Sequence, residues 1–120
     1  MYDHVGLRIG NLAASGRFYR AVLAPLGYVA DASGGGFGPD GRPMLWLHEH
    51  ADAGVRGVHL AFAAASRAAV DAFHHAGVAA GGRDNGAPGL RSDYGPNYYA
   101  AFLLDPDGNN VEAVCLKPGN

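Results

Sequence analysis

The sequence has very little cysteine and no long apolar run, and each absence excludes a class of protein. Cys115 is the only cysteine among 120 residues, so no disulfide can form within the chain. No apolar stretch approaches the roughly 20 residues that a helix needs to cross a bilayer. No charged and then apolar leader precedes the first motif. We therefore expect a soluble, cytoplasmic protein that does not enter a membrane.

A basic excess is also missing. The chain has 9 lysines and arginines against 11 aspartates and glutamates, which gives a formal net charge of -2. Nucleic-acid binding normally needs positive charge to displace counterions from phosphates, so we expect no nucleic-acid partner. With 48% hydrophobic residues, the chain can bury a core of its own. We expect a single domain over residues 1–120.

The chain contains two copies of one pattern, offset by 55 residues. This shift aligns four landmarks without a gap, namely His4 with His59, Asn11 with Ser66, Phe18 with Phe73 and Gly27 with Gly82. In each copy, alternating apolar residues predict a first strand, and apolar residues at helical spacing predict a helix after it. We expect module one at about residues 2–50 and module two at about residues 56–117.

Both copies predict the order strand, helix and three further strands. In the second copy the predicted elements are a strand at 57–63, a helix at 67–77, a glycine-rich stretch through Gly81, Gly86 and Gly89, and strands near 97–104 and 110–116. A helix should cover the apolar face of each sheet, because that face needs a packing partner. We therefore expect an α+β fold in which two βαβββ modules form a curved, cup-like mixed sheet with helices on the outer face.

Three polar side chains are expected on the sheet face opposite the helices. His4 and His59 begin the two first strands, and Glu112 lies between two apolar residues of the last strand. A carboxylate inside a strand is costly unless it is paired. Two imidazoles and one carboxylate are the ligand set of many divalent metal sites. We expect a metal at His4, His59 and Glu112; alternatively, the histidines are half-buried and Glu112 pairs with Arg8 or faces solvent.

Other residues of this face are candidates for binding a substrate. Tyr98 and Phe102 should point to the same side as Glu112, because alternate residues of paired strands share a face. Tyr98 can orient a substrate or act as an acid, unless it is only a packing residue. The Arg91 guanidinium suits a carboxylate or phosphonate, unless it is a solvated loop charge. Trp46 either closes one wall of the pocket or packs in the core.

Two further features are expected to be inert. His74 and His75 lie on the second predicted helix, where Asp71 and His75 should form a surface pair with a spacing of four residues. The GGGFG stretch lacks the lysine and the serine or threonine of a phosphate-binding loop, so it predicts a turn or a short strand.

The sequence resembles a known family. The stretches DHVGLRIGNLAASGRFYRAVLAPLGY, VHLAFAA and YYAAFLLDPDGNNVEAV look like the glyoxalase/bleomycin-resistance/dioxygenase group, also called the vicinal oxygen chelate superfamily. The resemblance covers nearly the whole chain. It implies paired βαβββ modules around one divalent ion, with His4, His59 and Glu112 as ligands. It also implies a homodimer, since paired modules in this family often complete the cup across subunits.

The resemblance is incomplete at a fourth ligand. Glyoxalase I members use a carboxylate in the last strand of the first module. Here the position symmetric with Glu112 falls near Trp46 or His48, and Glu49 should lie on the opposite face from Trp46. His48 is left as a candidate replacement ligand or pocket residue. The ligand set looks more like the dioxygenase and fosfomycin-modifying branches.

We predict a metal-dependent enzyme of lyase, isomerase, thiol transferase or dioxygenase type. Its ion, which is Fe, Mn, Ni or Zn, would act as a Lewis acid on a small substrate with vicinal oxygen atoms. One alternative is a metal-free small-molecule-binding protein, as in the bleomycin-sequestering branch. Another is a remnant with a structural or regulatory role. At this stage His4 can join His59 and Glu112 of its own chain or of a partner.

Overall fold

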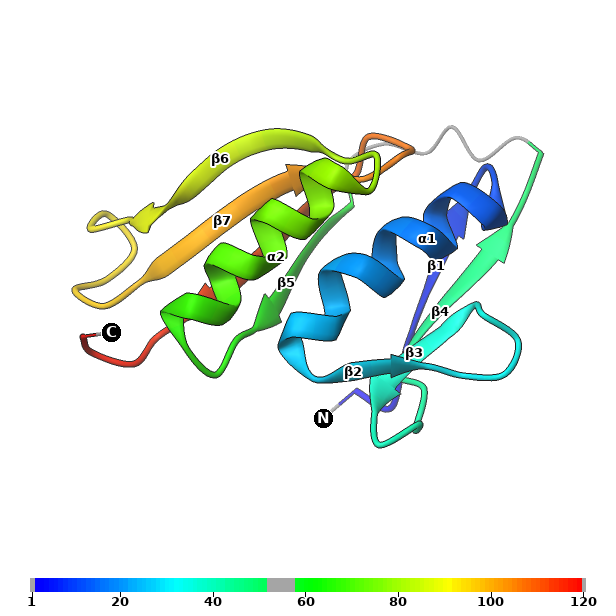
Figure 1. Cartoon of the computed structure of the whole chain (residues 1–120), viewed down its shortest axis with the longest axis horizontal. Coiled ribbons are helices and arrows are strands. Elements are labelled where there is room, and N and C mark those ends of the chain that lie inside the picture. Colours follow the sequence, from blue (N-terminus) through cyan, green and yellow to red (C-terminus); the bar gives the residue numbers. More distant parts are fainter. Residues whose placement is uncertain (1, 52–57, 120) are drawn as a thin grey trace.

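A computed structural model describes residues 2–51 and 58–119, and it shows two modules with the same order of elements (Figure 1). Module one contains β1 (Val5–Ile9), α1 (Leu12–Leu23), the 3-10 helix η1 (Ala24–Leu26), β2 (Tyr28–Ala30), β3 (Gly36–Pro39) and β4 (Leu45–Glu49). Module two contains β5 (His59–Ala63), α2 (Arg67–Ala79), β6 (Arg83–Leu90), β7 (Tyr99–Leu104) and β8 (Asn110–Cys115). The predicted α+β class with two βαβββ modules is confirmed. The expected start of module two, at residues 56 and 57, lies outside the described residues.

Each module forms its own four-stranded mixed sheet. The strand order is β1-β4-β3-β2 in module one and β5-β8-β7-β6 in module two. The first and last strands of each module pair in parallel, whereas the other pairs are antiparallel. Both first strands, β1 and β5, therefore lie at an edge of their sheet.

Equivalent side chains begin the two main helices. The Asn11 side chain accepts a hydrogen bond from the Ala14 N–H, and the Ser66 hydroxyl accepts one from the Ala69 N–H. Each bond satisfies a donor that the helix itself leaves unpaired. Asn11 and Ser66, which the 55-residue shift aligns, are therefore both helix N-caps, and this supports the internal repeat.

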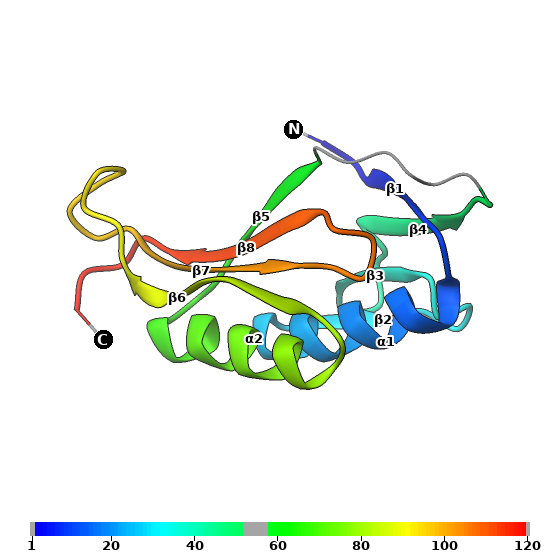
Figure 2. The ribbon, with the colours of Figure 1, turned by 90° about the horizontal axis from the view of Figure 1, so that it is seen from above.

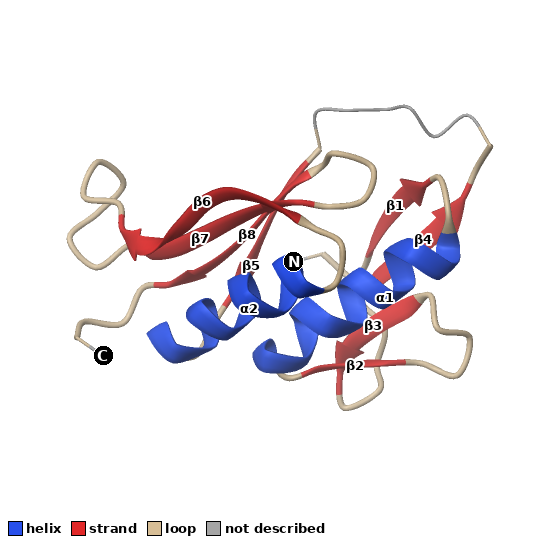
Figure 3. Cartoon of the chain, turned by 45° about the horizontal axis from the view of Figure 1, so that its top comes forward, coloured by secondary structure: helices blue, strands red, loops and turns tan. Residues whose placement is uncertain are grey.

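The two helices lie side by side on one side of the sheets (Figures 2 and 3). Phe18 and Phe73, which the repeat aligns, are both fully buried in one shared core. Gly77 allows the helices to approach, because a Cβ atom there would collide with Val22 of α1 and Leu103 of β7. Among the described residues, no helix is long and apolar enough to span a membrane.

A buried polar contact joins the modules. The Tyr19 hydroxyl of α1 donates to Asp105 Oδ2 at 2.6 Å, and Asp105 begins the turn between β7 and β8. Asp105 also accepts from the side chain of Asn109, and Asp107 of the same turn accepts from the Gly10 N–H at 2.9 Å. Tyr19 and Asp105 are only 0% and 2% exposed. The Asp-Pro-Asp-Gly turn therefore fixes the start of β8 against module one.

The glycine-rich stretch of module two contains the first of the three strands that the predicted order places after the helix. Residues 83–90 form β6, an eight-residue strand paired with β7. Its register shifts between Asp84 and Gly86, and again between Gly86 and Gly89. Glycine normally weakens the signal for a strand, but here it marks the irregular positions of one.

Candidate functional site

The centre of the candidate site is a contact between His59 and Glu112. β5 and β8 are parallel neighbours, and Ala61 lies opposite Glu112, so His59 and Glu112 point to the same face. His59 Nε2 lies 2.8 Å from Glu112 Oε1. The Glu112 residue is 2% exposed, whereas the His59 side chain is 47% exposed. The carboxylate is thus buried beneath an imidazole that solvent can reach.

The second carboxylate oxygen of Glu112 accepts a hydrogen bond from Tyr98. Its hydroxyl donates to Glu112 Oε2 at 2.5 Å from the residue just before β7. Removal from water, and then the hydrogen bond to Glu112 and its negative charge, together raise the pKa of Tyr98 to about 12. Tyr98 therefore keeps its proton at neutral pH and is a donor at this site.

These side chains line one cavity, which we call the module-two pocket. It has a volume of about 390 Å³ and is lined by His59, Tyr94, Tyr98, Phe102, Asn110 and Glu112. Phe102 lies opposite Glu112 in the sheet, and its ring stacks on that of His59 with centroids 6.4 Å apart. The pocket therefore combines the apolar Phe102 ring with an acid, an imidazole, an amide and two phenols.

Sequence reasoning did not select two of these lining residues. Asn110 lies two positions before Glu112 and on the same face, so strand alternation contained the signal. Tyr94 comes from the loop between β6 and β7, and its ring packs against Tyr98 with centroids 5.2 Å apart. No periodic pattern marks a loop residue, so Tyr94 could not be found in this way.

Arg91 lies beside this pocket. Its Cζ atom is 5.4 Å from the centre of the Phe102 ring. The guanidinium donates from Nη1 to the Gly89 carbonyl and from Nη2 to the Ala87 carbonyl. Arg91 is therefore held against β6 and is not a freely solvated loop charge.

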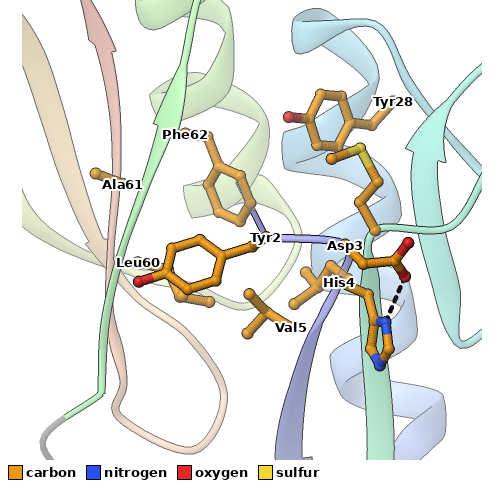
Figure 4. A pocket seen from close by; sticks show the side chains of 10 residues that line it. Tyr2, Asp3, His4, Val5, Tyr28, Leu60, Ala61 and Phe62 are labelled. Atoms are coloured by element: carbon orange, nitrogen blue, oxygen red, sulfur yellow. Dashed lines mark hydrogen bonds and ion pairs between the residues drawn. The ribbon is translucent and has the colours of Figure 1, made fainter.

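The structure places His4 apart from this group. His4 Nδ1 lies 2.7 Å from Asp3 Oδ1, and His4 lines a different cavity of about 270 Å³ between the modules. Figure 4 shows the His4 ring turned toward Asp3, with Phe62 on the other side of that cavity. Within residues 2–51 and 58–119, no three histidine, cysteine, aspartate or glutamate side chains are grouped to hold a metal. The three expected ligands do not meet within the described part of one chain.

Module one has no carboxylate at the position equivalent to Glu112 of module two. β1 pairs with β4 so that Gly6 lies opposite Trp46, and under the 55-residue shift this matches Ala61 opposite Glu112. Trp46 is therefore the structural counterpart of Glu112. Its indole lies over Gly36, where a Cβ atom would come within 2.7 Å of the ring.

Two neighbours of Trp46 face different surroundings. The His48 ring lies beside Gly6, where a Cβ atom would be 3.3 Å from it. Glu49 accepts a hydrogen bond from the Leu12 N–H at 2.9 Å, so its carboxylate serves the beginning of α1. Neither Trp46 nor His48 is among the residues that line the module-two pocket.

The donor atoms of the module-two pocket fit part of a metal site. An imidazole nitrogen and a carboxylate oxygen on neighbouring strands are two of the three protein ligands in a 2-His-1-carboxylate set. A second imidazole is not among the described residues that line this pocket. The residues present thus fit a divalent ion if a second imidazole is brought to them.

The expected surface pair on α2 was wrong. Asp71 accepts a hydrogen bond from the Tyr99 hydroxyl at 2.6 Å, so its carboxylate is directed at β7 and not along the helix to His75. His74 instead lies 2.8 Å from Asp84 of β6. Asp71 and His74 of α2 therefore interact with strands of the sheet, and the predicted pair along the helix does not form.

Comparison with known proteins identifies the family. The model of the glyoxalase/bleomycin resistance protein/dioxygenase superfamily matches residues 2–113. The chain belongs to this superfamily. A solved glyoxalase/bleomycin resistance protein from Albidiferax ferrireducens T118 is 31% identical with a TM-score of 0.80, and the match covers 98% of this chain and 99% of that one. No curated protein matches the chain.

Two more distant solved structures share the fold. A glyoxalase/bleomycin resistance protein/dioxygenase family enzyme from Burkholderia phytofirmans PsJN is 19% identical, with a TM-score of 0.74 and coverage of 98% of this chain and 100% of that one. A glyoxalase-related enzyme from Fulvimarina pelagi is 22% identical, with a TM-score of 0.70 and coverage of 93% and 86%. The predicted membership of the vicinal oxygen chelate superfamily is confirmed.

Proposed function

We propose that this superfamily member is a divalent-metal-dependent enzyme acting on a small substrate with vicinal oxygen atoms. The observation that carries the proposal is the buried Glu112 carboxylate, which lies 2.8 Å from His59 in an open pocket. Such a carboxylate is costly to bury unless it serves a cation or is fully hydrogen-bonded. The reaction is of the lyase, isomerase, thiol transferase or dioxygenase type.

Each residue of the pocket has a proposed role. His59 and Glu112 hold the ion, which when bound polarises the substrate oxygens as a Lewis acid. The Tyr98 hydroxyl has one proton, which its pKa of about 12 retains, and it donates this proton to Glu112. Once an ion holds Glu112, the same proton could turn to a substrate oxygen. The Phe102 ring supports the substrate and keeps the His59 imidazole in its orientation.

We further propose that a homodimer completes the ligand set, with His4 of a second copy as the third donor. His4 and His59 occupy equivalent positions in the two modules, and both β1 and β5 are edge strands that another chain can approach. The His4 side chain is 56% exposed, so a partner can reach it. Its contact with Asp3 would orient the imidazole, as carboxylates commonly do for metal-binding histidines.

Metal content tests the first part of this proposal. We expect about one ion per chain by mass spectrometry of untagged protein, and its loss in His59→Ala and Glu112→Ala. His75→Ala is the matched control, because this exposed histidine lies on α2 away from the pocket. Wild-type protein that binds none of Fe(II), Mn, Ni and Zn after anaerobic loading would refute metal dependence.

A mixing experiment tests the shared site. His4→Ala and His59→Ala should each lose the ion when purified alone. If ligands come from two subunits, a heterodimer of the two variants has one site with both histidines and one site with neither. Refolding the mixture should therefore restore one ion per heterodimer, counted by native mass spectrometry. No restoration despite heterodimer formation would assign all ligands to one chain.

A metal-free binding protein is the second candidate function. Both oxygens of Glu112 already have partners, His59 and Tyr98, so the carboxylate is satisfied without an ion. In that case the acid and the aromatic rings would hold a flat cationic compound. Its affinity, measured by equilibrium titration, would then be unchanged by a chelator and by His59→Ala.

A further inference from the structure

We infer that the substrate of the module-two pocket carries an oxyanion, a carboxylate or a phosphonate, and that Arg91 binds it beside Phe102. This inference rests on the proposed function in one respect, because it takes the module-two pocket as the substrate site. It adds a substrate class, small oxyacids, and a residue that selects for it.

The Arg91 guanidinium lies over the Phe102 ring. Arg91 follows β6, but its side chain turns back over the sheet and places Cζ 5.4 Å from the Phe102 ring centre. The other neighbour of that ring is His59, which stacks on it. A cation therefore lies on the same face as His59 and Glu112, one aromatic ring away from them.

Two glycines of β6 leave room for the Arg91 side chain. A Cβ atom at Gly89 would lie 3.2 Å from Arg91 Nη1 and would meet no other atom within 4 Å. A Cβ atom at Gly86 would lie 3.2 Å from Nη2 and 2.9 Å from the Phe102 ring. Both glycines lie at register shifts of β6. A solvated arginine requires neither glycines nor bulges in the neighbouring strand.

The positive charge of Arg91 is not paired with an acidic side chain in the described part of the chain. Among the described residues, the ion pairs involve His4, His59 and His74, and none involves Arg91. The two partners of Arg91 are the neutral carbonyls of Ala87 and Gly89, at 2.7 and 3.0 Å. A guanidinium has five N–H donors, so donors remain after these two bonds, already oriented by them. Oxyanions are the ligands that such a fork of donors binds best.

The geometry also sets the size of the ligand. The pocket has a volume of about 390 Å³, and Phe102, which lies under the Arg91 guanidinium, lines it together with Glu112 and Tyr98. An oxyanion at Arg91 would place the remainder of a small molecule against the Phe102 ring, with its other oxygen atoms at the His59 end. Arg91 would then act in binding and orientation, and the proton chemistry would remain with Tyr98.

Two probes test this inference on the verified metal-free protein. Phenylphosphonate and benzoate each combine an oxyanion with a ring that can lie on Phe102, and isothermal titration measures their affinities. We expect saturable binding of at least one of them at one site per chain, and the tighter probe identifies the anion. Arg91→Gln should weaken that binding by about tenfold or more, as expected for loss of a charge-assisted pair. Arg91→Lys keeps the charge but loses the forked set of donors, so its affinity for the probe should lie between those of the wild type and Arg91→Gln.

Matched variants separate a specific site from general charge. Arg83→Gln removes an exposed arginine from the start of the same strand and should leave binding unchanged. Gly89→Ala leaves the charge intact but displaces Nη1, so it should weaken binding while circular dichroism stays native. Binding of neither probe to the wild type, or equal binding to wild type and Arg91→Gln, would overturn the inference.

The same samples distinguish this inference from the proposed function. Arg91→Gln should retain the metal content of the wild type, because Arg91 is not a proposed ligand. A wild type without metal whose probe binding depends on Arg91 would remove the enzyme proposal and keep the anion site. If the wild type contains metal and the Arg91→Gln change does not alter probe binding, the enzyme proposal would be kept and the anion site removed.

Discussion

The two modules share an element order but carry very different side chains on the face opposite the helices. In module two, Glu112 is buried and joins His59 and Tyr98 around a pocket. In module one, the position of Glu112 holds Trp46, whose indole covers Gly36. Capping residues and core aromatics match between the modules, because the fold needs them in both. The open face is under no such constraint, so chemistry can be concentrated in one module.

The equivalent helices α1 and α2 show a second difference between the modules. The 55-residue shift aligns Tyr19 of α1 with His74 of α2, and each contacts an aspartate. Tyr19 reaches across to Asp105 of the other module in a buried place, whereas His74 reaches Asp84 of its own module at the surface. One contact holds the modules together, and the other only attaches a helix to its own sheet.

The largest effect is expected at the aligned pair Glu112 and Trp46. Glu112→Gln keeps the side-chain shape but removes the charge that a cation needs. We expect metal affinity to fall by more than about 100-fold, because loss of an outer-shell partner alone costs about 10- to 100-fold. Trp46→Phe, the matched change in module one, should leave the affinity unchanged. Competition with a coloured chelator measures both, and equal losses would contradict the functional division between modules.

The next effect is expected at the contact between modules. Tyr19→Phe removes the hydroxyl that donates to the buried Asp105 carboxylate, which keeps its bonds to Asn109 and Asp107. We expect the free energy of unfolding at pH 7 to fall by about 1.5–3 kcal/mol, the range for hydrogen bonds to charged groups. Urea titration measures this. A loss no greater than that in His74→Gln would show that the two contacts are equivalent.

The same tyrosine predicts a pH dependence. Burial, and then the charge of Asp105, raise the pKa of Tyr19 well above its usual value of about 10. A raised pKa stabilises the fold below the unfolded pKa, and this contribution is lost as the pH rises through the folded pKa. The wild type should therefore lose stability above about pH 10, and Tyr19→Phe should lose it less steeply. Urea titrations between pH 8 and 11 would refute this if both slopes were the same.

The smallest effect is expected at the surface contact of module two. The Gly86 N–H, and then His74, lower the pKa of Asp84. His74→Gln should therefore raise the Asp84 pKa toward its ordinary value of about 3.9 without removing the contribution of Gly86. An NMR titration of the Asp84 carboxyl carbon measures the change. A pKa that falls or stays constant would show that His74 does not interact with this carboxylate in solution.

Local sequence patterns predicted the elements, the repeat and the shared face of His59, Phe102 and Glu112. These features follow from alternation within strands and from caps, which act over a few residues. The way in which the two modules pack against each other could not be predicted from such local patterns. It depends on the packing of α1 against α2 and on the contact from Tyr19 to Asp105, which are 86 positions apart. The separation of His4 from Glu112 follows from that tertiary arrangement.

The glycine-rich β6 shows another limit of sequence reasoning. A strand with two register shifts has no clean period, so the bounds of β6 could not be predicted around Gly86 and Gly89. The choice between Trp46 and His48 as the counterpart of Glu112 also depended on register, which only the pairing of β1 with β4 resolves.

The contact between Tyr19 and Asp105 has a consequence for recombination. The family's Asp-Pro-Asp-Gly turn belongs to module two in sequence, but Tyr19 and Gly10 of module one hold it in place. A chimera that takes module one from a relative would therefore change the support of the strand that carries Glu112. An exchange that preserves this site must therefore transfer more than module two, because α1 of module one and the turn before β8 have to come from the same protein.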